Sequence, residues 1–246
     1  MKVNAFLAVR LGSSRVPFKN FMLLGKKPMY EYLTDTACRV SNIDQLYFNT
    51  DSQIAIDIAE SKYGAMLQYY LRPADLGTSS APLDDYVYDF MTKHPSDITV
   101  FLNPCSIFLS ESTISGAIEH FKKNSLDSCV ASAVCQTHCF HMNEPINFNL
   151  KDRQPRSQDL SPIHAMTSGF FIWRNSSFIE HYERNGYANF CGAFESFGIS
   201  QIESIDIDEA EDFKLAKLVA QDKDIDVIKY HPTIAQLIDD NAIQVN

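Results

Sequence analysis

Residues 3–20 read Val3-Asn-Ala-Phe-Leu-Ala-Val9-Arg10-Leu-Gly-Ser-Ser-Arg15-Val-Pro-Phe-Lys19-Asn20, and this stretch sets the expected fold class. Its first part, residues 3–9, is an apolar run with the length and composition of a buried strand. The polar residues at 10–15 predict that the strand ends in a loop. In open α/β sheets ligands bind at the carboxyl ends of the strands, so we expect a binding site at this loop.

The chain downstream of this loop alternates between helix and strand. Pro28 is placed to begin a helix, and residues 50–52 and Gly64 are placed to begin and end the next one. The predicted strands cover residues 3–9, 45–49, 65–70, 98–102, 128–134, 166–173 and 201–207, and the predicted helices cover residues 28–40, 53–62, 83–93, 112–123 and 208–221. Strands separated by helices pair in parallel through right-handed crossovers, so we expect a three-layer α/β/α fold with a mostly parallel sheet.

One segment breaks this alternation. Residues 135–165 are polar, contain several Asn and Pro residues, and show no sustained period. A segment of this length without its own core is uncommon inside a compact domain unless it is functional or covered. We therefore expect residues 1–246 to form a single domain from which 135–165 protrude as an arm, and we expect the arm to pack against a second copy in a homodimer.

Composition and charge exclude several classes of protein. The 246 residues are 45% hydrophobic and carry 21 Lys and Arg against 31 Asp and Glu, a formal net charge of -10. A chain this acidic gains nothing electrostatically from a nucleic-acid backbone, which argues against nucleic acid as a partner. No run approaches the ~18 consecutive apolar residues of a membrane helix, and the N-terminus lacks the pattern of a secretory signal. The sequence thus predicts a cytoplasmic protein that does not enter the membrane and whose cysteines remain thiols.

The loop at residues 10–20 concentrates side chains that can hold phosphate. Arg10, Arg15 and Lys19 supply positive charge, while Ser13 and backbone amides supply hydrogen-bond donors. Such a set can wrap a phosphate chain and neutralise the charge that grows when a phosphoryl group is attacked. The loop has the spacing of neither a P-loop nor a dinucleotide-binding fingerprint. A solvated basic turn is the alternative that this loop, taken alone, leaves open.

A group of acidic residues lies near the end of the chain. The run Ile205-Asp206-Ile207-Asp208-Glu209 is predicted to pass from a strand into a helix. In a strand Asp206 and Asp208 point to the same side, so their carboxylates can converge on Mg²⁺, which binds through one or two carboxylates plus substrate phosphates. Capping of the helix by Asp208 is the alternative, and both roles are compatible.

A run of cysteines and histidines and a group of aromatic residues are both interpreted as structural rather than functional. The run Cys135-x-x-His138-Cys139-x-His141 offers four metal-ligating side chains. Zinc sites usually take two pairs of ligands from separate turns, and this run is too compact for all four to reach one tetrahedral ion. The aromatic residues of the predicted strand 166–173 are expected to pack in the core.

Four motifs occur in the order and spacing of a known family. They are Arg10-x-x-Ser13-x-Arg15-x-Pro17-x-Lys19-Asn20, Asn49-Thr50-Asp51 ahead of a helix, Leu71-Arg72-Pro73-Ala74-Asp75-Leu76, and Ser204-Ile205-Asp206-Ile207-Asp208-x-x-x-Asp212-Phe213. Over about residues 3–221 the chain resembles the acylneuraminate cytidylyltransferases, the CMP-sialic acid synthetases, which are related to the KDO cytidylyltransferases. The resemblance implies an enzyme with a Rossmann-like nucleotidyltransferase fold that transfers CMP from CTP to an acidic keto-sugar and releases pyrophosphate.

The resemblance also implies roles for individual residues. The CTP phosphates are assigned to Arg10, Ser13, Arg15 and Lys19, the ribose or base to Asn20 and Arg72, and the metal to Asp206 and Asp208. The implied catalytic residues are Arg10, Lys19 and Asp208. The implied mechanism is in-line attack by the sugar's anomeric hydroxyl on the α-phosphorus, with Mg²⁺ as cofactor and the basic loop stabilising the leaving pyrophosphate. No general base is evident, and positioning and charge stabilisation can supply most of the rate.

The sugar side of the predicted site departs from the family pattern. Asn103 stands where the family has a Gln that contacts the sugar, and Ser168 replaces the Asn of an Asn-Gly pair. Both stay candidates for binding the acceptor. The departures predict an acceptor other than N-acetylneuraminate. They leave open a nucleotidyltransferase for a non-sugar acid or a phosphonate, and a nucleotide-binding protein without turnover.

Overall fold

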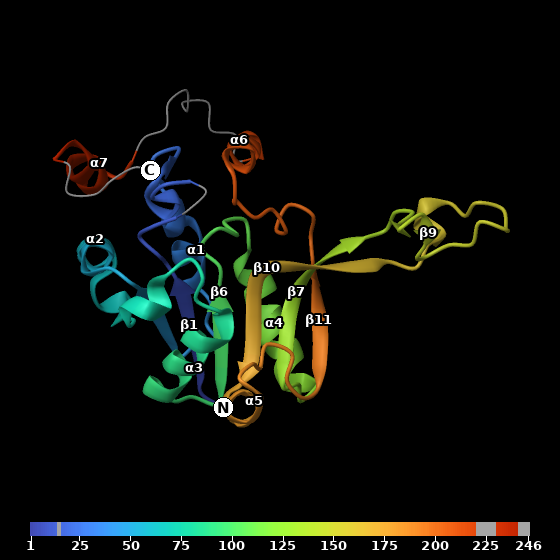
Figure 1. Cartoon of the computed structure of the whole chain (residues 1–246), viewed down its shortest axis with the longest axis horizontal. Helices are drawn as coiled ribbons and strands as arrows, with labels where there is room; N and C mark the ends of the chain where they lie inside the picture. Colours follow the sequence, from blue (N-terminus) through green and yellow to red (C-terminus); the bar gives the residue numbers. More distant parts are fainter. Residues whose placement is uncertain (14–15, 220–229, 241–246) are drawn as a thin grey trace.

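The computed structural model describes residues 1–13, 16–219 and 230–240. Within these ranges seven strands form one large sheet, in the order β11-β7-β10-β6-β1-β4-β5 (Figure 1). Their bounds are β1 (Val3–Ala8), β4 (Gln45–Thr50), β5 (Gln68–Leu71), β6 (Ile98–Leu102), β7 (Ser128–Cys135), β10 (Ile163–Arg174) and β11 (Phe194–Ile199). Strand β10 is antiparallel to its neighbours β6 and β7, and the other pairs are parallel. The predicted α/β class with a mostly parallel sheet is confirmed.

Helices cover both faces of this sheet. The helices on these faces are α1 (Met29–Ala37), α2 (Gln53–Tyr63), α3 (Leu83–Lys93), α4 (Glu111–Lys123) and α5 (Asn175–Asn185). Two further helices, α6 (Ala210–Val219) and α7 (Pro232–Asp239), lie beyond one end of the strands (Figure 1). Short 3-10 helices are η1 (Lys19–Phe21), η2 (Gly64–Met66), η3 (Ala74–Gly77) and η4 (Ser157–Asp159). Among the helices that the structure describes, none has both the length and the apolar character needed to cross a bilayer.

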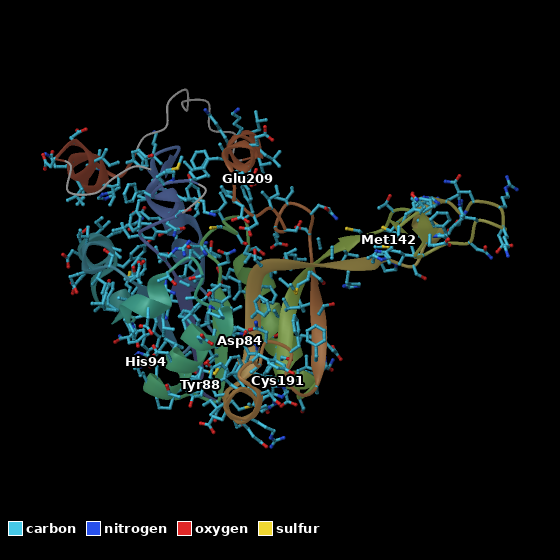
Figure 2. The ribbon with its side chains drawn as sticks, viewed as in Figure 1. Asp84, Tyr88, His94, Met142, Cys191 and Glu209 are labelled. Atoms are coloured by element: carbon cyan, nitrogen blue, oxygen red, sulfur yellow. The ribbon has the colours of Figure 1, made fainter. Side chains whose placement is uncertain are left out.

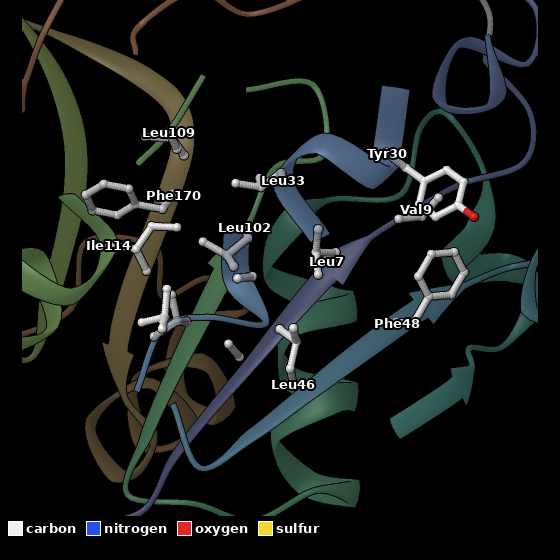
Figure 3. Close-up of a cluster of buried hydrophobic side chains, with 14 of the residues drawn as sticks. Leu7, Val9, Tyr30, Leu33, Leu46, Phe48, Leu102, Leu109, Ile114 and Phe170 are labelled. Atoms are coloured by element: carbon white, nitrogen blue, oxygen red, sulfur yellow. The ribbon is translucent and has the colours of Figure 1, made fainter. Parts of the chain in front are cut away.

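The alternation of side chains along the strands builds a separate core on each face. Leu7 and Leu102 point to the face covered by α1, α2 and α4, and Figure 3 shows them beside Leu33 and Ile114. On the opposite face Phe6 packs with residues of α3 and α5 in a second cluster. Burial of these side chains removes apolar surface from water on both sides, which fixes the three layers.

Local sequence signals place several of the helices where we expect them. The Ser52 hydroxyl accepts a hydrogen bond from the Ala55 backbone N–H at the start of α2, and Gly64 ends that helix with a φ of +48°. Ser110 begins α4 in the same way, accepting from the Thr113 N–H. Side-chain oxygens satisfy the unpaired amides of the first turn, and glycine tolerates a positive φ.

The order of the strands reverses beside β1. The chain runs from β1 through α1 to β4 on one side, and β6 later pairs with β1 on the other side. The loops that leave the carboxyl ends of β1 and β6 therefore diverge. In open α/β sheets this divergence creates the crevice in which ligands bind. A small hairpin of β2 (Leu23–Leu24) and β3 (Lys27–Pro28) follows the loop after β1.

The segment between β7 and β10 extends away from the sheet (Figure 1). It contains a hairpin of β8 (Phe140–His141) and β9 (Glu144–Pro145). The predicted arm of residues 135–165 is too long at both ends, because residue 135 belongs to β7 and residues 163–165 belong to β10, so from here the arm means residues 136–162. Met142 on the arm is 85% exposed, and Figure 2 shows it on the projecting segment, away from the helices of the main body. That the arm packs against a second copy stays a prediction.

The prediction of a strand over residues 201–207 is wrong. Residues 201–204 form a turn and residues 205–208 have no regular structure, so the strand that precedes them is β11, which the sequence reading missed along with α5. The alternation of Ile and Asp looks like a strand, but the Ile207 N–H donates to the Cys105 carbonyl at 3.2 Å, so this backbone binds a loop instead of a strand edge. Helix α6 begins at Ala210, and residues 220–221 of the predicted helix lie outside the described ranges.

Candidate active site

A cavity of about 400 Å³ opens at the carboxyl ends of β1 and β6. The predicted site residues that line it are Arg10, Ser13, Lys19, Asn20, Arg72, Asn103, Ser168, Asp206 and Asp208. The remaining one, Arg15, lies outside the described residues. The fold thus gathers at one place residues that the chain separates by nearly its whole length.

The loop after β1 is closed on itself by hydrogen bonds. The Asn20 side-chain amide donates to the Arg10 carbonyl at 2.9 Å, and the Arg10 Nε donates to the Gly12 carbonyl at 2.9 Å. Asn20 is 6% exposed, so it is part of the wall that shapes the loop. Ser13 is half-buried on the cavity side of the loop. These contacts hold cationic and hydroxyl groups at the mouth of the crevice.

Lys19 links the basic loop to the acidic segment. Its Nζ donates to Asp208 Oδ1 at 2.9 Å and to the Ile207 carbonyl at 2.6 Å, while the residue is only 7% exposed. Burial opposes its charge, but Cys105 and Asp208 outweigh that effect and raise the pKa of Lys19. The ammonium group therefore stays charged at neutral pH. A fixed positive charge in the wall of the cavity can bind phosphate oxygens.

Asp206 and Asp208 reach the cavity although they do not lie on a strand. The N–H groups of Asp208 and Glu209 donate to the Asp212 carboxylate at 2.9 and 2.7 Å, which caps the start of α6, and Figure 2 shows Glu209 beside this helix. Ile207 between the two acids is fully buried. Burial, followed by the charges of Asp208 and Asp212, raises the pKa of Asp206. Both carboxylates line the cavity, and a bound cation would relieve the repulsion between them.

Asn103 and Ser168 contact Asp206. The Ser168 hydroxyl donates to Asp206 Oδ2, and the Asn103 amide donates to the Ser168 Oγ at 3.0 Å and to both Asp206 oxygens at 3.4 Å. The Asn103 carbonyl oxygen accepts from the Cys105 N–H at 3.1 Å. The two residues predicted on the sugar side therefore also orient one of the two acids.

Arg72 is a buried cation without a carboxylate contact at its Nε. It is 5% exposed, and in the described part of the chain its Nε has no hydrogen-bond partner. Its guanidinium carbon lies 5.1 Å from the centre of the Tyr86 ring. Burial is the main cause that lowers the pKa of Arg72 below its ordinary value. Arg72 also lines the cavity, so its guanidinium group is suited to an acceptor atom of a ligand there.

Sequence reasoning missed Tyr86, although it lines the cavity. Tyr86 lies within α3, where an aromatic side chain is ordinary, so no local signal marks it. Phe171 was expected in the core as part of the strand 166–173; it is 6% exposed, and together with Phe101 it also lines the cavity. Its neighbour Trp173 is fully buried, as expected.

Gly77 was also missed, and here a signal existed. A Cβ at Gly77 would lie 2.5 Å from the Asp51 Cβ, so only glycine allows the loop after β5 to approach this closely. Asp51 Oδ1 in turn accepts from the Leu11 N–H at 2.9 Å. The glycine that follows Leu76 therefore helps to hold the basic loop, and its position in a conspicuous loop motif could have pointed to it.

The donor set fits Mg²⁺ rather than zinc. No group of three or more His, Cys, Asp or Glu side chains in metal-binding arrangement occurs among the described residues. A pair of carboxylates fits a hard cation that completes its shell with water and substrate phosphates. On the arm, His138 Nε2 lies 3.1 Å from the Pro155 carbonyl and its ring packs on Phe148, which supports a structural role there.

The fold and this site together define a class of protein. An α/β sheet whose crevice combines buried cations with paired carboxylates is suited to a phosphate-bearing ligand and a hard metal ion. The family model described as "Cytidylyltransferase" matches residues 5–230. The chain therefore belongs to the cytidylyltransferase family.

Individual relatives are distant. The chain is 28% identical over 228 residues to the CMP-N,N'-diacetyllegionaminic acid synthase of Legionella pneumophila, covering 88% of this chain and 95% of that one. It is 24% identical over 253 residues to the N-acylneuraminate cytidylyltransferase of Escherichia coli O18:K1:H7, covering 97% of this chain but only 57% of that one. The solved CMP:2-keto-3-deoxy-manno-octonic acid synthetase complexed with CTP has a similar fold, with a TM-score of 0.67 and 14% identity over 90% of this chain and 99% of that one.

Proposed function

We propose that this protein transfers CMP from CTP to an acidic keto-sugar, sialic-acid-like or KDO-like, and forms a CMP-activated sugar and pyrophosphate. Membership of the cytidylyltransferase family supports CTP as the nucleotide, and the acids named in the relatives' descriptions support an acidic keto-sugar as the acceptor. The single observation that carries the proposal is the meeting of Lys19 with Asp208 beside Asp206 in one cavity. A cation suited to phosphate and two acids suited to a metal ion thereby lie within reach of the same ligand.

The basic loop would hold the triphosphate. Arg10, Ser13, Arg15 and Lys19 are assigned to its oxygens, with Arg10 and Lys19 acting as catalytic residues. Negative charge grows on the leaving pyrophosphate as the anomeric oxygen attacks the α-phosphorus. Cations that are already fixed in the wall stabilise this charge without reorganising. The burial of Lys19 strengthens that interaction, because less water screens it.

Asp206 and Asp208 would hold Mg²⁺, and Asp208 is also assigned a catalytic role. When bound, Mg²⁺ supplies positive charge to phosphate oxygens. Asp208 balances Lys19 through the 2.9 Å contact, so the two charges fix each other's position. Asp206 is oriented by Asn103 and Ser168.

Arg72 and Asn20 are assigned to the ribose or base. Arg72 lines the cavity, so its guanidinium group can donate to an acceptor oxygen or nitrogen of the nucleoside, and the Tyr86 ring lies beside the guanidinium. Asn103 and Ser168 are assigned to the acceptor. Their contact with Asp206 would place the attacking sugar next to the acidic pair.

We further infer a cytoplasmic homodimer in which the arm packs against a second copy. The exposed apolar residues that support this are Phe140, Met142, Ile146 and Leu150. Single exposed apolar side chains are ordinary, but several on one projecting segment mark an interaction surface. Sedimentation velocity of the wild-type chain and of a variant with Met142→Ser and Leu150→Ser tests this. A dimer that dissociates in the variant supports the interface, and a monomeric wild-type chain contradicts it.

The test of the reaction is pyrophosphate release from CTP and Mg²⁺ with a panel of sialic, legionaminic, pseudaminic and KDO-type acids. ATP, GTP and UTP serve as nucleotide controls, and Asp208→Asn serves as the enzyme control. Release with CTP and one keto-sugar acid supports the proposal. Release only with a phosphonate or a non-sugar acid identifies the alternative acceptor class. CTP binding without release from any acceptor favours a binding protein without turnover, and the absence of CTP binding refutes the assignment of the cavity.

A further inference from the structure

Outside the cavity, one carboxylate holds the turn that leads to the acidic pair. Oxygen Oε1 of Glu203 accepts from the Ser110 N–H at 3.0 Å, the Ser110 hydroxyl at 2.8 Å and the Thr113 hydroxyl at 2.6 Å. Oxygen Oε2 accepts from the Ser200 N–H at 3.3 Å and its hydroxyl at 2.9 Å. One oxygen thus binds the start of α4, and the other binds the turn that contains Glu203 itself.

The position of Glu203 favours its charged form. It lies at the N-terminus of α4, a helix of 13 residues whose unpaired amides and aligned dipoles favour an anion. Burial opposes ionisation, but the hydrogen bonds from Thr113 and Ser110 outweigh it and lower the pKa of Glu203. The contact is therefore made by a carboxylate, and charge-assisted hydrogen bonds of this kind are strong.

A second contact lies on the other side of Asp206. The Ile207 N–H donates to the Cys105 carbonyl at 3.2 Å. Cys105 and Ser110 belong to the same connection between β6 and α4, so residues 203–207 run along this connection and are tied to it near both ends. Asp206 lies between the two ties. Because residues 205–208 have no sheet or helix hydrogen bonds of their own, these contacts replace the missing secondary structure.

We propose that Glu203 is a positioning residue that fixes Asp206 and Asp208 for the complex of metal and nucleotide. The inference rests on the proposed function, because it takes the two acids as the metal ligands. Glu203 is not among the residues that line the cavity, so it acts through the backbone that it anchors. Residues that orient metal ligands from behind typically change metal affinity by about 10- to 100-fold when they are removed.

The experiment measures Mn²⁺ binding to the full chain with CTP and no acceptor, by the electron paramagnetic resonance signal of free Mn²⁺. The same titration of CTP without protein is subtracted, because the triphosphate itself binds Mn²⁺. Omitting the acceptor separates binding from turnover. The variants are Glu203→Ala and Glu203→Gln. The matched control is Glu195→Ala, because Glu195 on β11 pairs with His120 in the last turn of α4 at 2.7 Å, so it also contacts α4 but does not anchor the acidic segment. Thermal melting of each variant reports its stability separately.

We expect Glu203→Ala to weaken Mn²⁺ binding by about 10-fold, and Glu203→Gln, which keeps an acceptor oxygen, to recover part of this loss. Glu195→Ala should bind Mn²⁺ as the wild-type chain does. Equal Mn²⁺ affinity in the wild-type chain and in both Glu203 variants overturns the positioning role, as does an equal loss in Glu195→Ala. If Glu203→Ala does not fold, Glu203→Gln carries the test. A wild-type chain that binds CTP but no Mn²⁺ refutes the metal assignment of the proposed function instead.

Discussion

Replacing Lys19 by alanine removes the group that joins the basic loop to the acidic segment. The Lys19 side chain is 9% exposed, and its ammonium group donates to Asp208 and to the Ile207 carbonyl. Loss of one partner of a buried ion pair costs about 3–5 kcal/mol. Asp208, however, is 38% exposed, so water takes over part of its solvation and we expect a loss of about 1–2 kcal/mol in the free energy of unfolding. For a chain of this size that corresponds to a fall in Tm of about 2–8 °C.

The effect on the nucleotide should be larger than the effect on stability. A hydrogen bond to a charged group contributes about 1.5–3 kcal/mol, so Lys19→Ala should weaken CTP binding by about 10- to 150-fold. Isothermal titration calorimetry with CTP and Mg²⁺ measures the affinity, and urea unfolding measures the stability. The matched control is Lys27→Ala, because Lys27 pairs with Asp35 at 2.5 Å and does not line the cavity. That variant should lose stability and keep its CTP affinity.

An unchanged CTP affinity in Lys19→Ala would refute the phosphate role of the loop. An equal loss of CTP affinity in both lysine variants would also refute it, because the effect would then follow from stability alone. The opposite pattern, in which only Lys19→Ala loses affinity, supports direct contact between Lys19 and the phosphates.

Three further outcomes test other parts of the reasoning. Asp208→Asn keeps the side-chain shape but removes a metal-binding charge, so we expect kcat to fall by about 100-fold in the pyrophosphate assay. The change also leaves the buried Lys19 ammonium without its charged partner, so we expect a lower Tm, and activity is compared well below it. Full activity would remove the metal assignment. Tyr86→Phe keeps the ring beside Arg72 and should leave the KM for CTP unchanged. Tyr86→Leu loses about 1–2 kcal/mol of cation–π contact and should raise the KM for CTP by about 5- to 30-fold. Equal KM values in these two variants would contradict this role of the ring. Burial opposes ionisation of the Asp35 carboxyl, but the hydrogen bond from Lys27 helps to lower its pKa. The stability that Asp35 contributes is therefore fully present above the ordinary carboxyl pKa. That stability is lost as the pH falls through the lowered pKa of Asp35, below about pH 4. Urea unfolding across that range should show a smaller acid-induced loss in Asp35→Asn, and identical pH profiles would count against the contact.

The elements with strong local signals could be predicted from the sequence. Helix α2 begins at a serine cap and ends at a glycine with positive φ, and both signals lie within the helix ends themselves. The apolar run of β1 and the polar loop that follows it are likewise predicted from neighbouring residues alone. For such elements neighbouring residues supply the hydrogen bonds and the burial pattern, so no distant partner is needed.

The end of the chain shows why other elements escaped prediction. β11 carries Glu195 and Gly198 within a short run and has no clean alternation, yet it forms a strand because its register along β7 supplies the hydrogen bonds. Residues 205–208 alternate clearly but find no strand edge, since Ile207 binds the loop after β6. β10 likewise lies between β6 and β7 because of how it pairs with these two strands. Alternation of apolar and polar side chains predicts a strand but does not specify its neighbours.

The sequence by itself determined the chemistry of the site: a run of cations and hydroxyls after the first strand, and a pair of acids far downstream. Side-chain identity and short spacings carry that information. Only the tertiary structure decided that Lys19 pairs with Asp208, that Asn103 and Ser168 orient Asp206, and that Arg72 lies buried beside Tyr86. These contacts join segments that are close only after the sheet has formed, because they depend on strand order and on loops that diverge at one edge.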